Sequence, residues 1–191
     1  YTSPKSSVEY RSARTSMYLL LDTITRLIAP VLTFTADEIW QGMPGEREES
    51  VHLASFPQLM DQRFDAELEA RYDQLQKVRA EVSKVLEKAR AEKQIGQSLE
   101  AKVSLQAPES VKGLLEEYRE QLASLFIVSQ VELVDQLAAG IEAEQLTGMK
   151  LTVQAADGEK CDRCWNFVTT VGENSDHPSI CARCAAALSA E

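Results

Sequence analysis

All four cysteines of this chain lie in its last 31 residues, as the pairs Cys161/Cys164 and Cys181/Cys184. Two residues separate the members of each pair and sixteen separate the pairs, a spacing typical of a structural zinc site. Each Cys-x-x-Cys turn directs two sulfurs at one ion, and two such turns complete a tetrahedron of thiolates. Because so short a segment buries little apolar surface, metal ligation would supply most of its folding free energy. The pattern predicts one structural Zn²⁺ ion.

Two other interpretations of the cysteines remain open, namely a pair of disulfides or four unrelated thiols. No secretory signal is visible, and the first 160 residues contain no cysteine. Reduced thiols and the absence of a targeting segment predict a cytoplasmic protein. The most apolar stretch, residues 17–34, is interrupted by Asp22, Arg26 and Pro30, so we expect no contact with a membrane.

The charge distribution limits how the chain can bind nucleic acid. Its formal net charge of −10 argues against binding by general electrostatic attraction. Residues 71–102 are locally basic, with eight basic and five acidic side chains, but four zinc-bound thiolates would make the C-terminal segment more acidic. Any contact between that segment and nucleic acid must therefore depend on a few well-placed side chains.

The N-terminal half has the periodicity of helices. Apolar residues at three-to-four spacing predict a helix over Val8–Ala29 that ends at Pro30, and a second helix over Val31–Gln41. Residues 46–63 are expected to form a loop with a short extended piece, Val51–Phe56, which includes His52. A long amphipathic helix is predicted over Asp65–Lys93, with an apolar stripe and a basic face.

Beyond residue 95 the pattern changes to mixed structure. Alternation predicts a strand over Leu99–Leu105, followed by a helix over Ser110–Ser124. Short strands are expected at 126–128, 131–134 and 150–154, and a turn at Asp157-Gly158. The predicted fold class is mainly α with a small α+β subdomain and a four-cysteine zinc-knuckle module. The expected domains are 1–94 (helical), 95–156 (α+β) and 157–191 (zinc finger).

The chain lacks the sequence signals of a complete enzyme. It contains no Gly-rich phosphate loop, no nucleophile elbow and no HExxH pattern. Its carboxylates include no pair that stands out as an acid–base couple. We therefore predict no catalytic residue in this chain.

Four stretches together resemble the C-terminal region of the bacterial isoleucyl-tRNA synthetases, which are class I aminoacyl-tRNA synthetases. The first resembles the paired helices of that family's anticodon-binding domain, the second a connector, the third the entry to its C-terminal junction, and the fourth its terminal zinc finger. In this sequence they are Ser12–Thr15 with Leu27–Trp40; Ser50–Leu53 with Phe56-Pro57; Ile95–Ala101; and Lys160–Trp165 with Ile180–Cys184. The resemblance covers essentially the whole chain in the right order.

The resemblance implies a function for the chain as part of a longer protein. It implies the tRNA-recognition portion of an isoleucine–tRNA ligase, with an N-terminally truncated helical domain and with the ATP-using catalytic domain and the editing domain elsewhere. The expected partners are the anticodon stem-loop of tRNA-Ile and the remainder of the synthetase chain, and the expected oligomeric state is a monomer. Kinship with the valine enzyme stays open, because substrate choice is made in the absent domains.

The resemblance also gives weight to particular side chains as RNA contacts. Trp165 is expected either to stack on an unpaired anticodon-loop base or to cover the small core beside the zinc. Arg163 is expected to contact a phosphate or a base, and Arg183 occupies the matching position of the second knuckle. Further expected phosphate contacts are Arg11, Arg14, Lys88, Arg90 and Lys93. Two alternative functions are a zinc-ribbon adaptor between proteins and a thiol redox or metal-transfer module.

Overall fold

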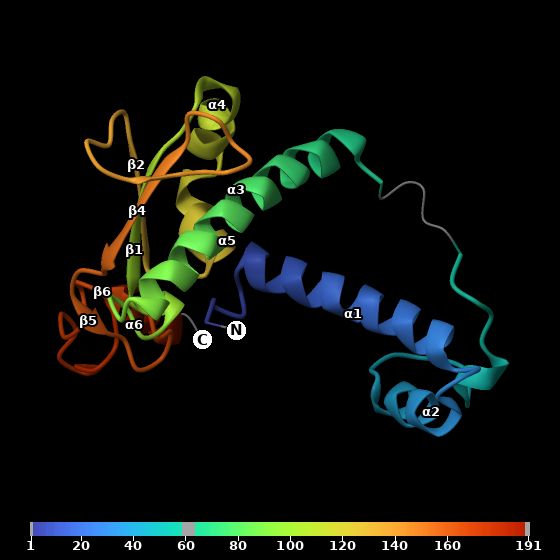
Figure 1. The fold of residues 1–191 in the computed structure, drawn as a ribbon. Coiled ribbons are helices and arrows are strands. Elements are labelled where there is room, and N and C mark those ends of the chain that lie inside the picture. The colour runs from blue at the N-terminus through green and yellow to red at the C-terminus, as the bar shows by residue number, and fades with distance from the viewer. Residues whose placement is uncertain (1, 59–63, 190–191) are drawn as a thin grey trace. The chain divides into compact units, whose positions relative to one another are not determined.

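A computed structural model describes residues 2–58 and 64–189 of the chain (Figure 1). Its contacts divide the chain into two compact units, one essentially Ser3–Phe64 and the other essentially Asp65–Ser189. The long helix of residues 66–91 belongs to the second unit. The three-part division at residues 94 and 156, which follows the changes of pattern along the sequence, stays a prediction.

The first unit is a pair of helices followed by an irregular segment. Helix α1 spans Val8–Ile28 and begins at Ser7, whose hydroxyl accepts a hydrogen bond from the Tyr10 N–H at 3.1 Å. Helix α2 spans Thr33–Gly42, and the two helices pack together through a small core. That core consists of Ala29, Ala36, Trp40, Met43 and Val51.

The prediction of an extended piece at Val51–Phe56 is wrong. Val51–Leu53 forms a 3-10 turn, η1, so His52 is not a strand residue. The carboxylate of Asp37 holds this turn by accepting hydrogen bonds from the Ser50 hydroxyl and the Val51 N–H. These same bonds, the Ser50 bond first, lower the pKa of Asp37. Residues 59–63 of the predicted loop lie outside the described part.

The second unit is a four-stranded sheet covered on its apolar face by helices. Strand β1 (Ala101–Gln106) lies between β2 (Gln130–Val134), which is parallel to it, and β4 (Lys150–Ala155), which is antiparallel. The two-residue strand β3 (Ile141–Glu142) pairs with the outer side of β4. The strand order is therefore β2-β1-β4-β3.

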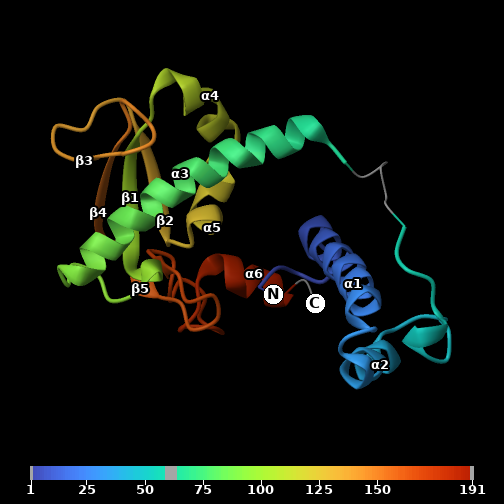
Figure 2. The same cartoon turned by 45° about the vertical axis from the view of Figure 1, so that its right-hand side comes forward.

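Helix α3 (Ala66–Ala91) passes across this sheet (Figure 2). It begins at Asp65, whose carboxylate accepts the Leu68 N–H at 2.9 Å. The predicted apolar stripe of α3 supplies much of the core, which it shares with β1 and with the helices α4 (Glu109–Glu117) and α5 (Leu122–Phe126). Because β1 and β2 are parallel, the chain must cross over between them, and α4 and α5 form that crossover.

Two predictions for the crossover are wrong. The single helix expected at Ser110–Ser124 is broken after Tyr118 by a 3-10 turn, Arg119–Gln121. Tyr118 is buried and its ring meets that of Tyr72 edge-on, with centroids 5.9 Å apart. The strand expected at 126–128 does not form, because Phe126 ends α5 and Ile127 adopts a left-handed conformation with φ of 58°.

A small module follows β4. It contains the two-stranded hairpin β5 (Glu159–Lys160) and β6 (Phe167–Val168) and the helix α6 (Ala182–Ser189), none of which was predicted. The predicted turn at Asp157-Gly158 leads into β5, and Gly158 has a φ of +92°. Over residues 2–58 and 64–189, no helix has both the length and the apolar character needed to cross a bilayer.

Candidate metal centre

The two cysteine pairs reach one point from different elements of the module. Cys161 directly follows β5, and Cys164 ends the turn between β5 and β6. Cys181 pairs with Val171 in an isolated β-bridge, and Cys184 lies in the first turn of α6. A hairpin tip and a helix start therefore face each other, each with two sulfurs.

The spacing of the sulfurs fits a metal site. All four Sγ atoms lie within 4.8 Å of one another, and those of Cys164 and Cys181 are 3.9 Å apart. Zinc–sulfur bonds of about 2.3 Å in a tetrahedron place sulfurs about 3.8 Å apart. A disulfide needs sulfurs about 2.05 Å apart, and all four cysteines are free. The geometry thus disagrees with the disulfide interpretation.

The surroundings of the thiols favour a cation among them. Burial opposes the ionisation of Cys161, but the backbone N–H groups of Cys164 and Cys181 lower the pKa of its thiol to about 6. Burial and the neighbouring Cys181 raise the pKa of Cys184 to about 12. A divalent cation would displace the remaining protons and offset half of the charge of four thiolates. Four sulfur donors suit zinc, which binds thiolates in tetrahedral sites.

Trp165 follows the first cysteine pair in an unusual conformation. Its φ is 66°, a region that bulky side chains rarely adopt, and its N–H donates to the carbonyl of Cys161 at 2.8 Å. The indole is 60% exposed, and the ammonium of Lys160 lies 5.7 Å from the ring centroid. Trp165 therefore does not cover the small core beside the sulfurs, as one interpretation of the sequence expected.

The predicted basic contacts are distributed over both units. Arg163 is half-buried in the turn between the first two cysteines, and Arg183 is exposed in the first turn of α6. Desolvation by the surrounding chain would lower the pKa of Arg183, but a hydrogen bond to the Cys164 sulfur raises it overall. Lys93 is exposed just beyond α3, whereas Arg14 lies on α1 in the other unit, with its guanidinium 5.6 Å from the Tyr10 ring centroid. Within the Asp65–Ser189 unit, the structure brings Arg163, Trp165 and Arg183 to the cysteine cluster.

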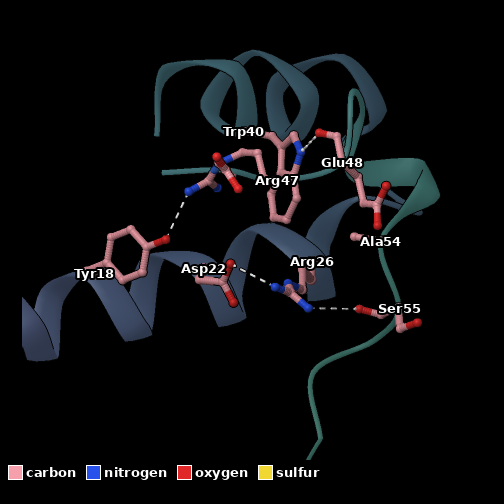
Figure 3. Close-up of a pocket in the computed structure, with 9 residues that line it drawn as sticks. Tyr18, Asp22, Arg26, Trp40, Arg47, Glu48, Ala54 and Ser55 are labelled. Carbon is pink, nitrogen blue, oxygen red and sulfur yellow. Dashed lines mark hydrogen bonds and ion pairs between the residues drawn. The ribbon is translucent and has the colours of Figure 1, made fainter. Parts of the chain in front are cut away.

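The sequence did not predict the polar cavity that lies in the first unit (Figure 3). The guanidinium of Arg26 lies 5.3 Å from the centroid of the Trp40 ring and that of Arg47 lies 4.7 Å from it. The Trp40 indole N–H donates to the carbonyl of Glu48 at 2.8 Å. No periodic pattern links these positions in the sequence, so nothing in it predicted that they meet.

The lining of this cavity gives no clear preference for a ligand. Its volume is about 300 Å³. Its lining includes two arginines and three acidic residues, so neither an anion nor a cation is favoured. Asp22 is already paired with Arg26, at 3.1 Å. The arrangement accounts for the burial of Trp40 without a bound molecule.

Comparisons with known proteins bear on both units. Residues 1–105 match the family described as the anticodon-binding domain of tRNA ligase, and residues 158–187 match the zinc finger found in FPG and IleRS. The isoleucine–tRNA ligase of Syntrophotalea carbinolica is 59% identical over 189 residues, 98% of this chain and 20% of that protein. The isoleucine–tRNA ligase of Geobacter sulfurreducens is 47% identical over 189 residues, again 98% of this chain and 20% of that protein. The chain therefore spans about a fifth of the length of these relatives.

Proposed function

Because this chain belongs to the family of anticodon-binding domains of tRNA ligases, we propose that it is the tRNA-recognition part of a bacterial isoleucine–tRNA ligase. The whole enzyme would activate isoleucine with ATP and transfer it to the terminal adenosine of its tRNA. This part would select and orient the tRNA through the anticodon stem-loop and would form no bond itself. The adaptor and redox alternatives are not favoured by these comparisons.

The cysteine cluster has a structural role in this proposal. Cys161, Cys164, Cys181 and Cys184 would hold one zinc ion and close its coordination shell, which leaves no position for a catalytic water. The ion would tie the hairpin tip to α6. A tetrathiolate site is stable in a reducing compartment, which supports a cytoplasmic location.

The observation that carries the tRNA proposal is the exposure of Trp165. A bulky side chain in a left-handed conformation costs about 1–3 kcal/mol, and such strain is often found at functional sites. Here the strained backbone presents an indole that is 60% exposed next to the cysteine cluster. An exposed aromatic face is what stacks on a splayed, unpaired base of an RNA loop.

The remaining basic residues would contribute phosphate contacts. Arg163 and Arg183 flank the same cluster as Trp165, while Arg14 and Lys93 are exposed elsewhere and would reach the stem or its backbone. These contacts would be few, in keeping with the net charge of −10. A monomer is sufficient for this role, because no second copy is needed to complete the site.

Replacement of Trp165 tests the proposal. In the complete synthetase, Trp165→Ala should raise the KM for tRNA about tenfold, because a base stack is worth about 1–3 kcal/mol. Trp165→Phe keeps an aromatic face and should recover most of the loss. Isoleucine-dependent ATP–pyrophosphate exchange should stay unchanged in both variants. An equal fall in exchange and in tRNA charging would contradict a recognition role.

A further inference from the structure

Within the Asp65–Ser189 unit, the zinc module, which comprises the β5–β6 hairpin and α6, is joined to the sheet by a turn and by the side chains of Ser129, Gln130 and Lys102. Strand β4 ends at Ala155, and the turn at Asp157-Gly158 leads into the β5–β6 hairpin. The tip of that hairpin carries Cys161, Cys164 and Trp165. The direction in which the tip points therefore depends on what holds the turn at Asp157 and the strand β6.

The side chain of Gln130, the first residue of β2, binds the turn that precedes the hairpin and the first residue of β6. Its Oε1 accepts a hydrogen bond from the Asp157 N–H at 3.0 Å, and its Nε2 donates to the Asp157 carbonyl at 2.9 Å. The same Nε2 lies 3.4 Å from the carbonyl of Phe167, in β6. The amide thus pairs with the backbone as a neighbouring strand would.

Ser129 completes the attachment. Its hydroxyl accepts the Phe167 N–H at 2.7 Å and donates to the carbonyl of Leu99, which precedes β1. Both backbone polar groups of Phe167 are consequently held by side chains at the start of β2. Phe167 lies two residues after Trp165. A hydrogen bond from the Cys161 N–H to the Asn166 carbonyl, at 2.9 Å, closes the hairpin loop that carries Trp165.

We infer that Gln130 is a positioning residue that fixes the direction in which the zinc module presents Trp165. This inference rests on the proposed function, since it concerns how the recognition side chain is aimed. The ion pair between Lys102 and Asp157, at 3.3 Å, lies at the same turn. A flexible ammonium, however, restricts the orientation of the module only weakly. The Gln130 amide fixes two acceptors and a donor in one plane, so it restricts rotation of the hairpin about the turn.

The first experiment measures orientation directly, by residual dipolar couplings of the zinc-loaded chain of 191 residues. Wild-type couplings of the sheet and of the zinc module should fit one alignment. In Gln130→Met, which keeps the length of the side chain and removes its hydrogen bonds, the module couplings should be smaller than that alignment requires. Ser129→Ala should have the same effect. Gln154→Met is the matched control, because Gln154 is exposed on β4 and its side chain makes no hydrogen bond to the described residues.

The second experiment measures the consequence in the complete synthetase. Gln130→Met should retain its zinc and raise the KM for tRNA about tenfold, since the three hydrogen bonds of the amide to the backbone are lost. The rate of ATP–pyrophosphate exchange should not change, and Trp165→Ala should add little to the defect of Gln130→Met.

The two experiments separate the inference from the proposed function. Couplings of Gln130→Met and Ser129→Ala that fit the wild-type alignment would overturn the positioning role, whatever the tRNA kinetics are. Loosened couplings together with an unchanged KM in both Gln130→Met and Trp165→Ala would support the attachment and overturn the recognition role of the module. A raised KM for Trp165→Ala but not for Gln130→Met would support recognition and overturn the positioning role.

Discussion

Lys93 has a backbone conformation that its side chain does not favour. Its φ is 59°, and it follows the last turn of α3, where the Lys93 N–H donates to the Arg90 carbonyl and the Gln94 N–H to the Ala89 carbonyl. This pair of bonds is a Schellman motif, whose left-handed position is usually glycine. A lysine at that position costs stability, which is consistent with a use for its charge outside the fold.

Lys93→Gly should therefore stabilise the chain by about 1 kcal/mol, because glycine adopts the left-handed conformation without a steric cost. Urea unfolding followed by circular dichroism would show the gain as a higher midpoint. Lys88→Gly is the matched control: Lys88 is exposed within α3, so this change should destabilise by about 1 kcal/mol. A loss of stability in Lys93→Gly would show that the lysine side chain itself stabilises the helix end.

Glu81 is a buried carboxylate that links α3 to the segment after β3. It accepts hydrogen bonds from the Glu144 N–H at 2.9 Å and from the Lys84 ammonium at 3.0 Å. Burial alone would raise its pKa, but these bonds lower the pKa below the ordinary value of 4.5. A carboxyl whose folded pKa is lowered stabilises the protein above its unfolded pKa and loses that effect as the pH falls through the folded pKa.

Glu81→Gln should thus be less stable than the wild type at pH 7, and the difference should shrink as the pH falls below about 4.5. Thermal unfolding between about pH 3 and pH 8 measures this difference. The comparison with wild type at each pH removes the effect of zinc loss in acid, which both proteins share. A difference that stays constant over the whole range would show that Glu81 acts by its shape and not by its charge.

At the scale of elements, the turn into the zinc module requires glycine at position 158. A Cβ at this position would lie 2.2 Å from the backbone carbon of Val168, and the φ of +92° is unfavourable for any other residue. Gly158→Ala should cost more than about 2 kcal/mol, because the close approach of Gly158 to the backbone of Val168 would be lost. Amide chemical shifts of residues 159–168 would report that loss.

Gly113 provides the opposite case for the same substitution. It lies within α4, and a Cβ there would meet nothing within 4 Å. Gly113→Ala should stabilise the chain by about 1 kcal/mol through helix propensity. Equal effects of the two substitutions would contradict the contact described at Gly158.

The elements that sequence periodicity predicted well are the long ones. Helices α1 and α3 and strands β1, β2 and β4 lie within a few residues of their predicted positions, since each has an apolar face repeated over several turns or alternations. The break in the helix at Tyr118 was missed because neither glycine nor proline marks it. The β5–β6 hairpin and α6 were missed because two-residue strands and an eight-residue helix are too short to show a period.

The candidate site was predictable to a different extent in each of its parts. The cysteine spacing alone led to a single cluster, because ligand spacing is fixed by the geometry of the ion. The exposure of Trp165 was left open by the sequence, since an aromatic residue beside a knuckle fits either a core or a surface. The role of Gln130 was not visible at all, because its partners are backbone groups 27 and 37 residues away.

At the scale of the whole molecule, the apolar cores are separate. The sheet and its covering helices share a continuous core that includes Val82, Val103 and Leu115. The buried core of the zinc module, in the same Asp65–Ser189 unit, consists of Cys161, Ile180, Cys181, Cys184 and Ala185. Three of the five residues in the second core are metal ligands in our proposal. The module therefore has few apolar contacts to keep it folded without an ion, while the folding of the sheet and its helices does not depend on an ion.

Zinc removal should thus unfold one part of the chain and leave the rest intact. A strong chelator should collapse the amide resonances of residues 158–187 to random-coil positions, and those of β1 and β4 should keep their dispersion, because their core lacks a metal ligand. Cys161→Ser should behave as the chelated wild type does, and elemental analysis should find one zinc per wild-type chain. Retention of dispersed finger resonances after chelation would overturn the structural role of the ion. Loss of the β1 and β4 resonances as well would show that the module and the sheet fold as a single unit.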